Sequence, residues 1–150
     1  SWPIMKDLLY LKDEQIKEFI QLLFYAYREI FADPKQILAK KLLGPAHLRS
    51  LNLIESNPGI SFGELMFKLK VTKQSLNRVL RDLKKLNMIK QIIDENDTRK
   101  KNIFLDKDGR IFFDAAYSAQ KKRIFNALKS SNAESVIKFK QVLKKIIDGK

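Results

Sequence analysis

The sequence predicts a mainly α-helical protein that carries one small β-hairpin. Most of the chain places apolar residues at three- and four-residue steps, which is typical of amphipathic helices. Only the segment from Met88 to Leu105 has the pattern of two short strands around a polar tip. With 150 residues, 45% of them hydrophobic and 31% charged, the chain suits a single globular domain over residues 1–150.

The first part of the chain predicts two helices separated by a connector. Apolar residues recur at helical spacing over residues 12–31. Asp33-Pro34 should end that helix, because the residue before a proline is disfavoured in the α region. We expect a short connector over residues 35–44 and then a helix from Pro45 to about Ser56.

The next segment predicts a helix-turn-helix. Asn57-Pro58-Gly59 is a strong break, and Ser61 with Glu64 has the spacing of a capping box for a helix over residues 62–69. Thr72 can cap a second helix over residues 72–87, and only the residues LKV separate the two. This three-residue separation is the spacing of a helix-turn-helix.

A hairpin and two further helices complete the prediction. Strands are expected at 88–94 and 102–105, joined by the polar residues 95–101. Asp108-Gly109 is expected to turn the chain into helices near 110–129 and 133–147. The predicted order is therefore a winged helix-turn-helix, with the hairpin as the wing, flanked by long N- and C-terminal helices.

The charge of the chain favours a polyanionic partner. Its net charge is +13 and its isoelectric point is about 9.9. Residues 1–33 sum to −2, so residues 34–150 carry +15. The basic charge therefore belongs to the body of the protein and not to a tail.

Several function classes find no support in the composition. There is no cysteine and one histidine, which argues against thiolate metal sites and against a paired Cys–His nucleophile. There is no glycine-rich phosphate loop and no HExxH, and no apolar run approaches the ~18–20 residues that span a bilayer. We expect a cytoplasmic protein that is not an enzyme, has no cofactor or metal site and has no membrane partner.

The polar face of the second helix carries the residue types that read bases. Opposite the apolar stripe lie side chains that can bond adenine or guanine edges, namely Lys73, Gln74, Asn77, Arg78 and Arg81. Thr72, Lys73 and Ser75 begin the helix, where phosphate contacts are natural. The alternative is an ordinary amphipathic helix with a solvated polar face, and the helix-turn-helix spacing and the basic hairpin favour DNA.

The hairpin tip suggests a second contact. Asp97 can orient the Arg99 guanidinium for the narrow minor groove, while Lys100 and Lys101 add charge beside phosphates. The alternative is a solvated turn with a weak surface ion pair.

These motifs together resemble the MarR family of bacterial transcription regulators. The residues that match are Pro58-Gly59, Glu64-Leu65, Thr72, Asp97, Arg99 and the run from Leu105 to Gly109. AHLRSL at 46–51 with TKQSLNRVL at 72–80 is closest to the PetP-like proteobacterial branch. The resemblance implies a winged core over about 45–106 and dimerisation helices over about 12–31 and 110–147.

The chain also departs from the family pattern. Met66-Phe67 replaces small residues, Asn87 replaces a glycine before the wing, and Asp106 replaces a threonine cap. Asn accepts left-handed backbone geometry, so the second change is tolerable.

The flanking helices bear on whether the chain forms a homodimer, and the aromatic residues bear on whether it binds a small molecule. The long apolar faces exceed what one small domain readily covers, which favours a homodimer on a pseudo-palindromic duplex; the alternative is that the faces pack on each other in a monomer. Members of the family often bind a small aromatic effector, and the aromatic or imidazole side chains that could line such a site are Tyr25, Tyr27, His47, Phe112, Phe113 and Tyr117. Aromatic residues at helical spacing more often form core, so the sequence assigns no ligand site.

The function expected from these patterns is a sequence-specific regulator that binds double-stranded DNA. Two alternatives remain open. One is a nucleoid-type binder without sequence preference, which lysine-rich composition favours because lysine acts mainly as a point charge. The other is a winged helix that binds RNA or a protein.

Overall fold

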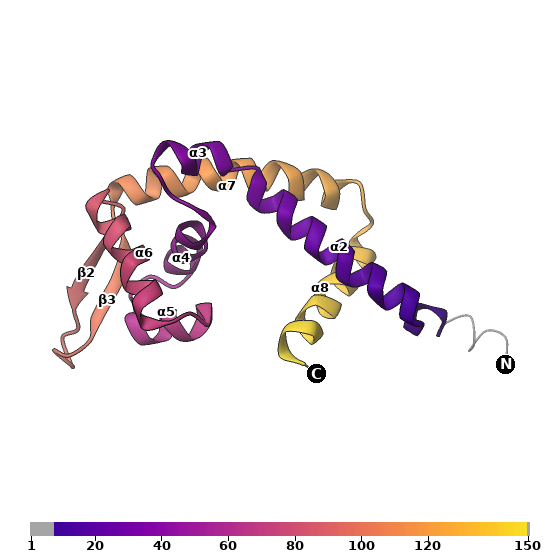
Figure 1. Cartoon of the computed structure of the whole chain (residues 1–150), viewed down its shortest axis with the longest axis horizontal. Helices are drawn as coiled ribbons and strands as arrows, with labels where there is room; N and C mark the ends of the chain where they lie inside the picture. Colours follow the sequence, from indigo (N-terminus) through magenta and orange to yellow (C-terminus); the bar gives the residue numbers. More distant parts are fainter. Residues whose placement is uncertain (1–7, 150) are drawn as a thin grey trace.

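The computed structural model describes residues 8–149 and divides into two regions (Figure 1). We call residues 34–117, which include the first half of α7 (Lys107–Lys129), the head. The body consists of the long helix α2 (Asp13–Ala32), residues 118–129 of α7 and all of α8 (Ala133–Asp148). A short 3-10 turn, η1 (Leu9–Leu11), precedes α2 (Asp13–Ala32). The body extends away from the head, and both the first and the last of the described residues lie there (Figure 1).

The head has the predicted order of elements. Helices α4 (Pro45–Ser56), α5 (Phe62–Leu69) and α6 (Lys73–Lys85) are followed by the wing strands β2 (Ile89–Ile93) and β3 (Lys101–Leu105). A two-residue strand, β1 (Ile60–Ser61), was not predicted, and it pairs with β3 to give a three-stranded antiparallel sheet of order β1-β3-β2. Ile60 lies opposite Ile103, and the Gly59 amide donates to the Ile103 carbonyl at 2.9 Å. The third strand of the sheet, β1, thus comes from a segment about 40 residues before β3 in the chain.

The head encloses its own core. The fully buried side chains come from each of its helices and from the central strand, and they include Leu48, Leu51, Ile54, Leu65, Leu76, Leu83 and Ile103. Helix α4 packs against α5, α6 and β3, so it is the scaffold on which the other elements are assembled.

The connector predicted at residues 35–44 is wrong in part, because it contains the helix α3 (Lys35–Lys40). The helix α2 ends at Ala32, yet Asp33 keeps α geometry (φ −54°, ψ −46°), and the break falls at Pro34, which lacks an N–H. The Pro34 carbonyl then accepts from the Leu38 amide at 3.0 Å, and Leu38 is buried in the core. Core packing therefore restarts the helix immediately after the proline.

The turn predicted at Asp108-Gly109 is also wrong, because α7 (Lys107–Lys129) already includes both residues. Asp106 caps this helix through the Lys107 amide at 2.8 Å. A Cβ atom on Gly109 would lie 1.9 Å from the Met88 carbonyl oxygen, so glycine is needed here for close packing and not for a turn. The expected left-handed geometry of Asn87 is confirmed, with φ 57°.

The body leaves most of its apolar surface exposed. None of the 20 residues of α2 is buried, and none of the described residues of α8 (Ala133–Asp148) is. Its large exposed apolar side chains include Ile16, Phe19, Ile20, Phe24, Ile137, Phe139, Val142 and Ile146. No helix of the described part is long and apolar enough to cross a membrane.

Candidate nucleic-acid interface

Helix α6 places the predicted base-reading residues on the outside of the head. Its apolar positions Leu76, Val79, Leu80 and Leu83 are buried in the core, so the polar positions between them face solvent. The residues predicted to face DNA are all exposed, namely Lys73, Gln74, Asn77, Arg78 and Arg81. Thr72 caps the helix by accepting the Ser75 amide at 3.1 Å, as expected, and both residues are exposed.

The turn before α6 is tight. Lys70 has left-handed geometry (φ 52°), and the chain enters α6 after only Val71 and Thr72. A lysine in this conformation is uncommon. Leu65 of α5 and Leu76 of α6, on either side of the turn, are both buried in the core. Phe67, one of the departures from the family pattern, is 80% exposed, whereas its neighbour Met66 packs against the core.

The exposed side chains of α6 lie on two sides of the helix, one facing away from the core and one facing the wing. Arg78 and Arg81 point away from the core, together with Lys85, which the sequence analysis did not single out. On the side towards the wing, Asn77, Arg81, Lys84 and Gln91 line a groove of about 400 Å³. The Lys84 ammonium donates to the Gln91 side-chain oxygen Oε1 at 2.9 Å, which links α6 to β2.

The wing tip is organised by two carboxylates. Asp97 accepts from Arg99 Nε at 3.1 Å, from Nη2 at 3.3 Å and from the Arg99 amide at 3.0 Å. The expected orientation of Arg99 by Asp97 is therefore present, with 89% of the arginine side chain exposed. These hydrogen bonds hold the pKa of Asp97 below its ordinary value.

Asp94 has a role that the sequence analysis missed. One of its carboxylate oxygens accepts from the Asn96 and Asp97 amides at 2.8 and 3.1 Å. The other oxygen accepts from the Asn102 side-chain amide at 3.1 Å. Hydrogen bonds from Asn96, Asn102 and Asp97 lower the pKa of Asp94. An Asx turn followed by a basic run was the available signal.

Lys100 and Lys101 are both exposed; Lys100 is the last residue of the tip and Lys101 is the first residue of β3. Lys101 belongs to the strand, opposite Ile93, and not to the polar tip in which it was predicted. Relative to the predicted bounds, β2 ends one residue earlier and β3 begins one residue earlier.

His47 lies on the inner side of the interface, where it joins α4 to α6. Its Nδ1 accepts from the Gly44 amide at 3.0 Å, so His47 helps to cap the start of α4. Its Nε2 lies 2.8 Å from Asp82 Oδ2, and Asp82 is the one acidic residue of α6. The outward face of α6 thus carries no unpartnered carboxylate.

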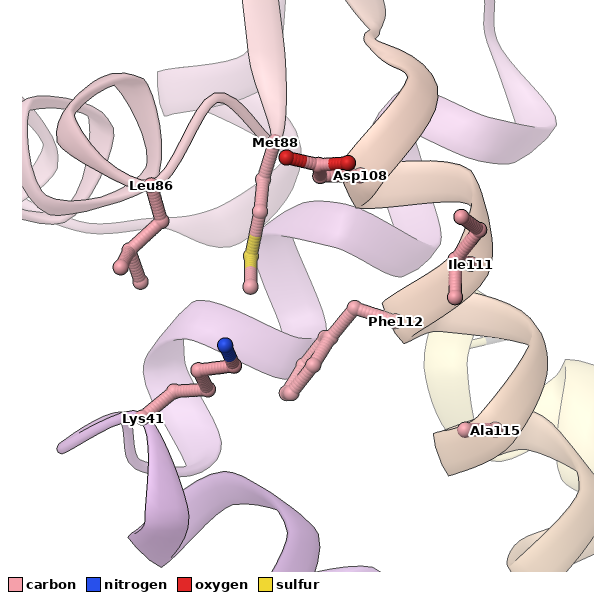
Figure 2. Close-up of a pocket in the computed structure, with 7 residues that line it drawn as sticks. All are labelled: Lys41, Leu86, Met88, Asp108, Ile111, Phe112 and Ala115. Carbon is pink, nitrogen blue, oxygen red and sulfur yellow. The ribbon is translucent and has the colours of Figure 1, made fainter.

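The aromatic residues considered for a ligand site do not gather in one place. Phe112 lines a pocket of about 390 Å³ beside the end of α6, into which Met88 points and towards which the Lys41 ammonium extends (Figure 2). Tyr27 does not line that pocket. Its hydroxyl accepts from Arg49 Nη1 at 2.7 Å. Phe113 is stacked on Tyr117. Among residues 8–149, no group of three His, Asp or Glu side chains could hold a metal ion.

These features define a winged helix-turn-helix protein: a capped helix with an exposed polar and basic face, beside a wing whose arginine is held by a carboxylate. A sequence model described as the MarR family matches residues 43–100. The chain is 36% identical over 146 residues to the HTH-type transcriptional regulator PetP of Rhodobacter capsulatus, covering 97% of this chain and 88% of that protein. The chain belongs to the MarR family and is a transcriptional regulator of that family, not an enzyme.

Solved structures agree on the fold. A MepR variant from Staphylococcus aureus superposes with a TM-score of 0.74 at 20% identity, covering 87% of this chain and 96% of that one. Streptococcus pneumoniae FabT in complex with DNA gives 0.74 at 16% identity, covering 91% and 96%. The S. aureus MepR–DNA complex gives 0.69 at 20% identity, covering 88% and 98%. At these identities the likeness concerns the fold alone.

Proposed function

We propose that the chain is a cytoplasmic homodimer that represses or activates transcription by reading a pseudo-palindromic duplex. The observation that carries this proposal is the outward face of α6, which presents Gln74, Asn77 and Arg78 while the helix's one carboxylate is turned inward to His47. The related FabT and MepR were solved with DNA, which supports duplex DNA as the partner here.

In this proposal the site residues divide into two groups. Lys73, Gln74, Asn77, Arg78 and Arg81 act in the major groove, with Thr72 and Ser75 at the phosphates near the start of α6. Arg99, oriented by Asp97, enters the minor groove, and Lys100 and Lys101 contact the backbone. Residues 1–150 form one MarR-like domain, with the winged core at about 45–106.

The dimer is supported by the exposed apolar faces of α2 and α8. A monomer in which these faces covered each other would bury them, whereas α2 has no buried residue. Helices of this kind are stable in water when a second copy covers them. A two-fold dimer would present two copies of α6 to two half-sites about one turn of DNA apart.

Sequence-specific and non-specific binding are separated by competition. Duplexes are selected from random DNA with the wild-type protein, and the affinity for a selected duplex is compared with that for a scrambled one at physiological salt. We expect a preference of at least ~10³-fold. Equal affinities would remove the specific regulator and leave the nucleoid-type binder.

Two substitutions distinguish base contacts from phosphate contacts. Arg78→Ala is expected to cost about 1–3 kcal/mol on the selected duplex and to relax the preferred sequence. Lys100→Ala is expected to weaken both duplexes alike and to lower the slope of log affinity against log salt by about one. If the two variants behaved alike, the assignment of α6 to base readout would be wrong.

A small-molecule effector is the second part of the proposal. The pocket in Figure 2 joins Leu86, which ends α6, to Phe112 of α7 and to Lys41 after α3, so an occupant would touch the helix that reads DNA. Its lining is mainly apolar and carries one ammonium, on Lys41, and one carboxylate, on Asp108, so it suits a small aromatic molecule whose own carboxylate pairs with Lys41. Benzoate should weaken binding to the selected duplex in the wild type and have no effect on Lys41→Gln; an equal effect on both proteins would exclude this pocket.

A further inference from the structure

The junction between α4 and α6 contains a polar contact to which the proposed function gives no role in positioning α6. His47 lies in the first turn of α4, and its Nε2 is 2.8 Å from Asp82 Oδ2 on α6. The two residues are 35 positions apart in sequence. The His47 side chain is 15% exposed and that of Asp82 is 41% exposed, so the imidazole is shielded from water while the carboxylate is partly solvated.

The second ring nitrogen determines the protonation of the contact. The Gly44 amide donates to Nδ1 at 3.0 Å, so Nδ1 is the acceptor. A neutral imidazole then carries its proton on Nε2 and donates it to the Asp82 carboxylate. A proton on Nδ1 would instead face the Gly44 N–H, donor against donor. The ring is therefore held at both nitrogens, in one tautomer.

Asp82 is placed where such a bond can control the orientation of α6. It follows Arg78 by one helical turn, and it lies on the flank of the helix that faces α4. On the opposite flank, the bond from Lys84 to Gln91 ties the helix to the wing. The buried stripe fixes α6 against the core, and these two bonds fix its rotation from either side.

We infer that His47 is a positioning residue for base recognition: its Nε2–H bond to Asp82 sets the rotation of α6 that directs Arg78 and Asn77 at base edges. This inference rests on the proposed sequence-specific function. Bidentate bonds to bases tolerate little misalignment, whereas contacts between lysine and phosphate act mainly through charge. Loss of the His47–Asp82 bond should therefore reduce discrimination and leave general DNA affinity nearly unchanged.

Two substitutions separate the two bonds of the ring. Asparagine places its amide near the position of Nδ1 and can keep the bond from Gly44, but it is too short for Asp82. Glutamine reaches the position of Nε2 and can still donate to Asp82. A purely structural role for His47 would make the two variants alike, whereas a positioning role through Asp82 makes them different.

The test measures the full-length wild type and variants on the selected and scrambled duplexes, with thermal unfolding of each protein as a check. His47→Asn should lose about tenfold in affinity for the selected duplex and less than about twofold for the scrambled one. His47→Gln should retain the wild-type preference within about threefold. Asp82→Ala should reproduce the loss of His47→Asn, and the double variant should be no worse than either. If His47→Asn does not fold, the comparison of Asp82→Ala with His47→Gln decides the question.

Nitrogen-15 NMR supplies an independent readout. The chain has one histidine, so its two ring nitrogens are assigned without ambiguity. The expected spectrum is that of the Nε2–H tautomer, and an Nδ1–H tautomer would overturn the inference. So would wild-type discrimination in His47→Asn, equal losses in the Asn and Gln variants, or losses of His47→Asn and Asp82→Ala that multiply. If the wild type itself does not discriminate, the proposed function fails first and this inference with it.

Discussion

The head and the body of this protein satisfy the hydrophobic effect in different ways. The head buries apolar side chains from α4, α5, α6 and β3 in a core of its own. The body holds long helices whose apolar residues remain open, with Ile20 62% exposed. The head therefore has a core within one chain, whereas the apolar faces of the body would be covered by the second copy in the proposed dimer.

The largest expected effect concerns the body. Ile20→Glu puts a carboxylate in the centre of the proposed dimer face, and burying it without a partner should cost about 3–5 kcal/mol or more. We expect monomers at micromolar concentration by size exclusion with light scattering, and a weaker affinity for the selected duplex. Gln21→Glu adds the same charge at the next position, on the polar side of α2, and should leave a dimer. If the wild type were itself a monomer, a second copy would not cover the apolar faces of the body, and the proposed dimer would be wrong.

The second prediction concerns the head. Gly109→Ala would place a methyl group against the Met88 carbonyl, where a Cβ would be 1.9 Å away, and α7 or the root of the wing must shift. We expect a loss of about 3 kcal/mol in denaturant unfolding, at the upper end of the overpacking range. The dimer interface should be unaffected if head and body are independent in packing.

Gly63→Ala is the matched control for this substitution. Gly63 lies in α5, and a Cβ added there meets nothing within 4 Å. The same change of residue should therefore raise stability slightly, by about 0.5–1 kcal/mol, because alanine is the better helix former. Equal destabilisation by both substitutions would show that the loss at Gly109 is not steric.

The smallest effect is expected at the junction of the two regions. Arg123 Nε donates to Asp33 at 2.6 Å, and this hydrogen bond lowers the pKa of the Asp33 carboxyl. The pair therefore stabilises the fold fully above the unfolded carboxyl's pKa of about 3.9, and its contribution is lost as pH falls through the lower pKa of the folded state. Thermal unfolding from about pH 5 to 2.5 should show a steeper loss in the wild type than in Asp33→Asn. Parallel curves would mean that the exposed pair adds nothing measurable.

The parts that sequence could predict are those fixed by local patterns. The 3.6-residue period placed Arg78 and Arg81 outward because the positions between them had to be buried. The Asp97–Arg99 contact spans two residues and follows from their spacing. The order of helices and wing strands was also correct for this reason.

The parts that it missed depend on contacts between distant residues. Strand β1 has two residues and exists only because Ile60 finds Ile103. The bond of His47 to Asp82 crosses from one helix to another, and neither residue has a neighbour in sequence that announces it. Gly109 was misassigned because the composition of an Asp-Gly pair suits a turn, while the approach of Met88 is a tertiary constraint.

Helix α7 is one unbroken rod of 23 residues that begins against the wing in the head and ends in the body (Figure 1). At 1.5 Å per residue it is about 35 Å long. A rod of that length works as a lever arm: a tilt of about 5° at its body end displaces the other end by about 3 Å, close to the ~3.4 Å rise of one base pair. In the proposed dimer, a change of about 5° in the tilt of α7 would therefore change the spacing of the two α6 helices by about one base pair.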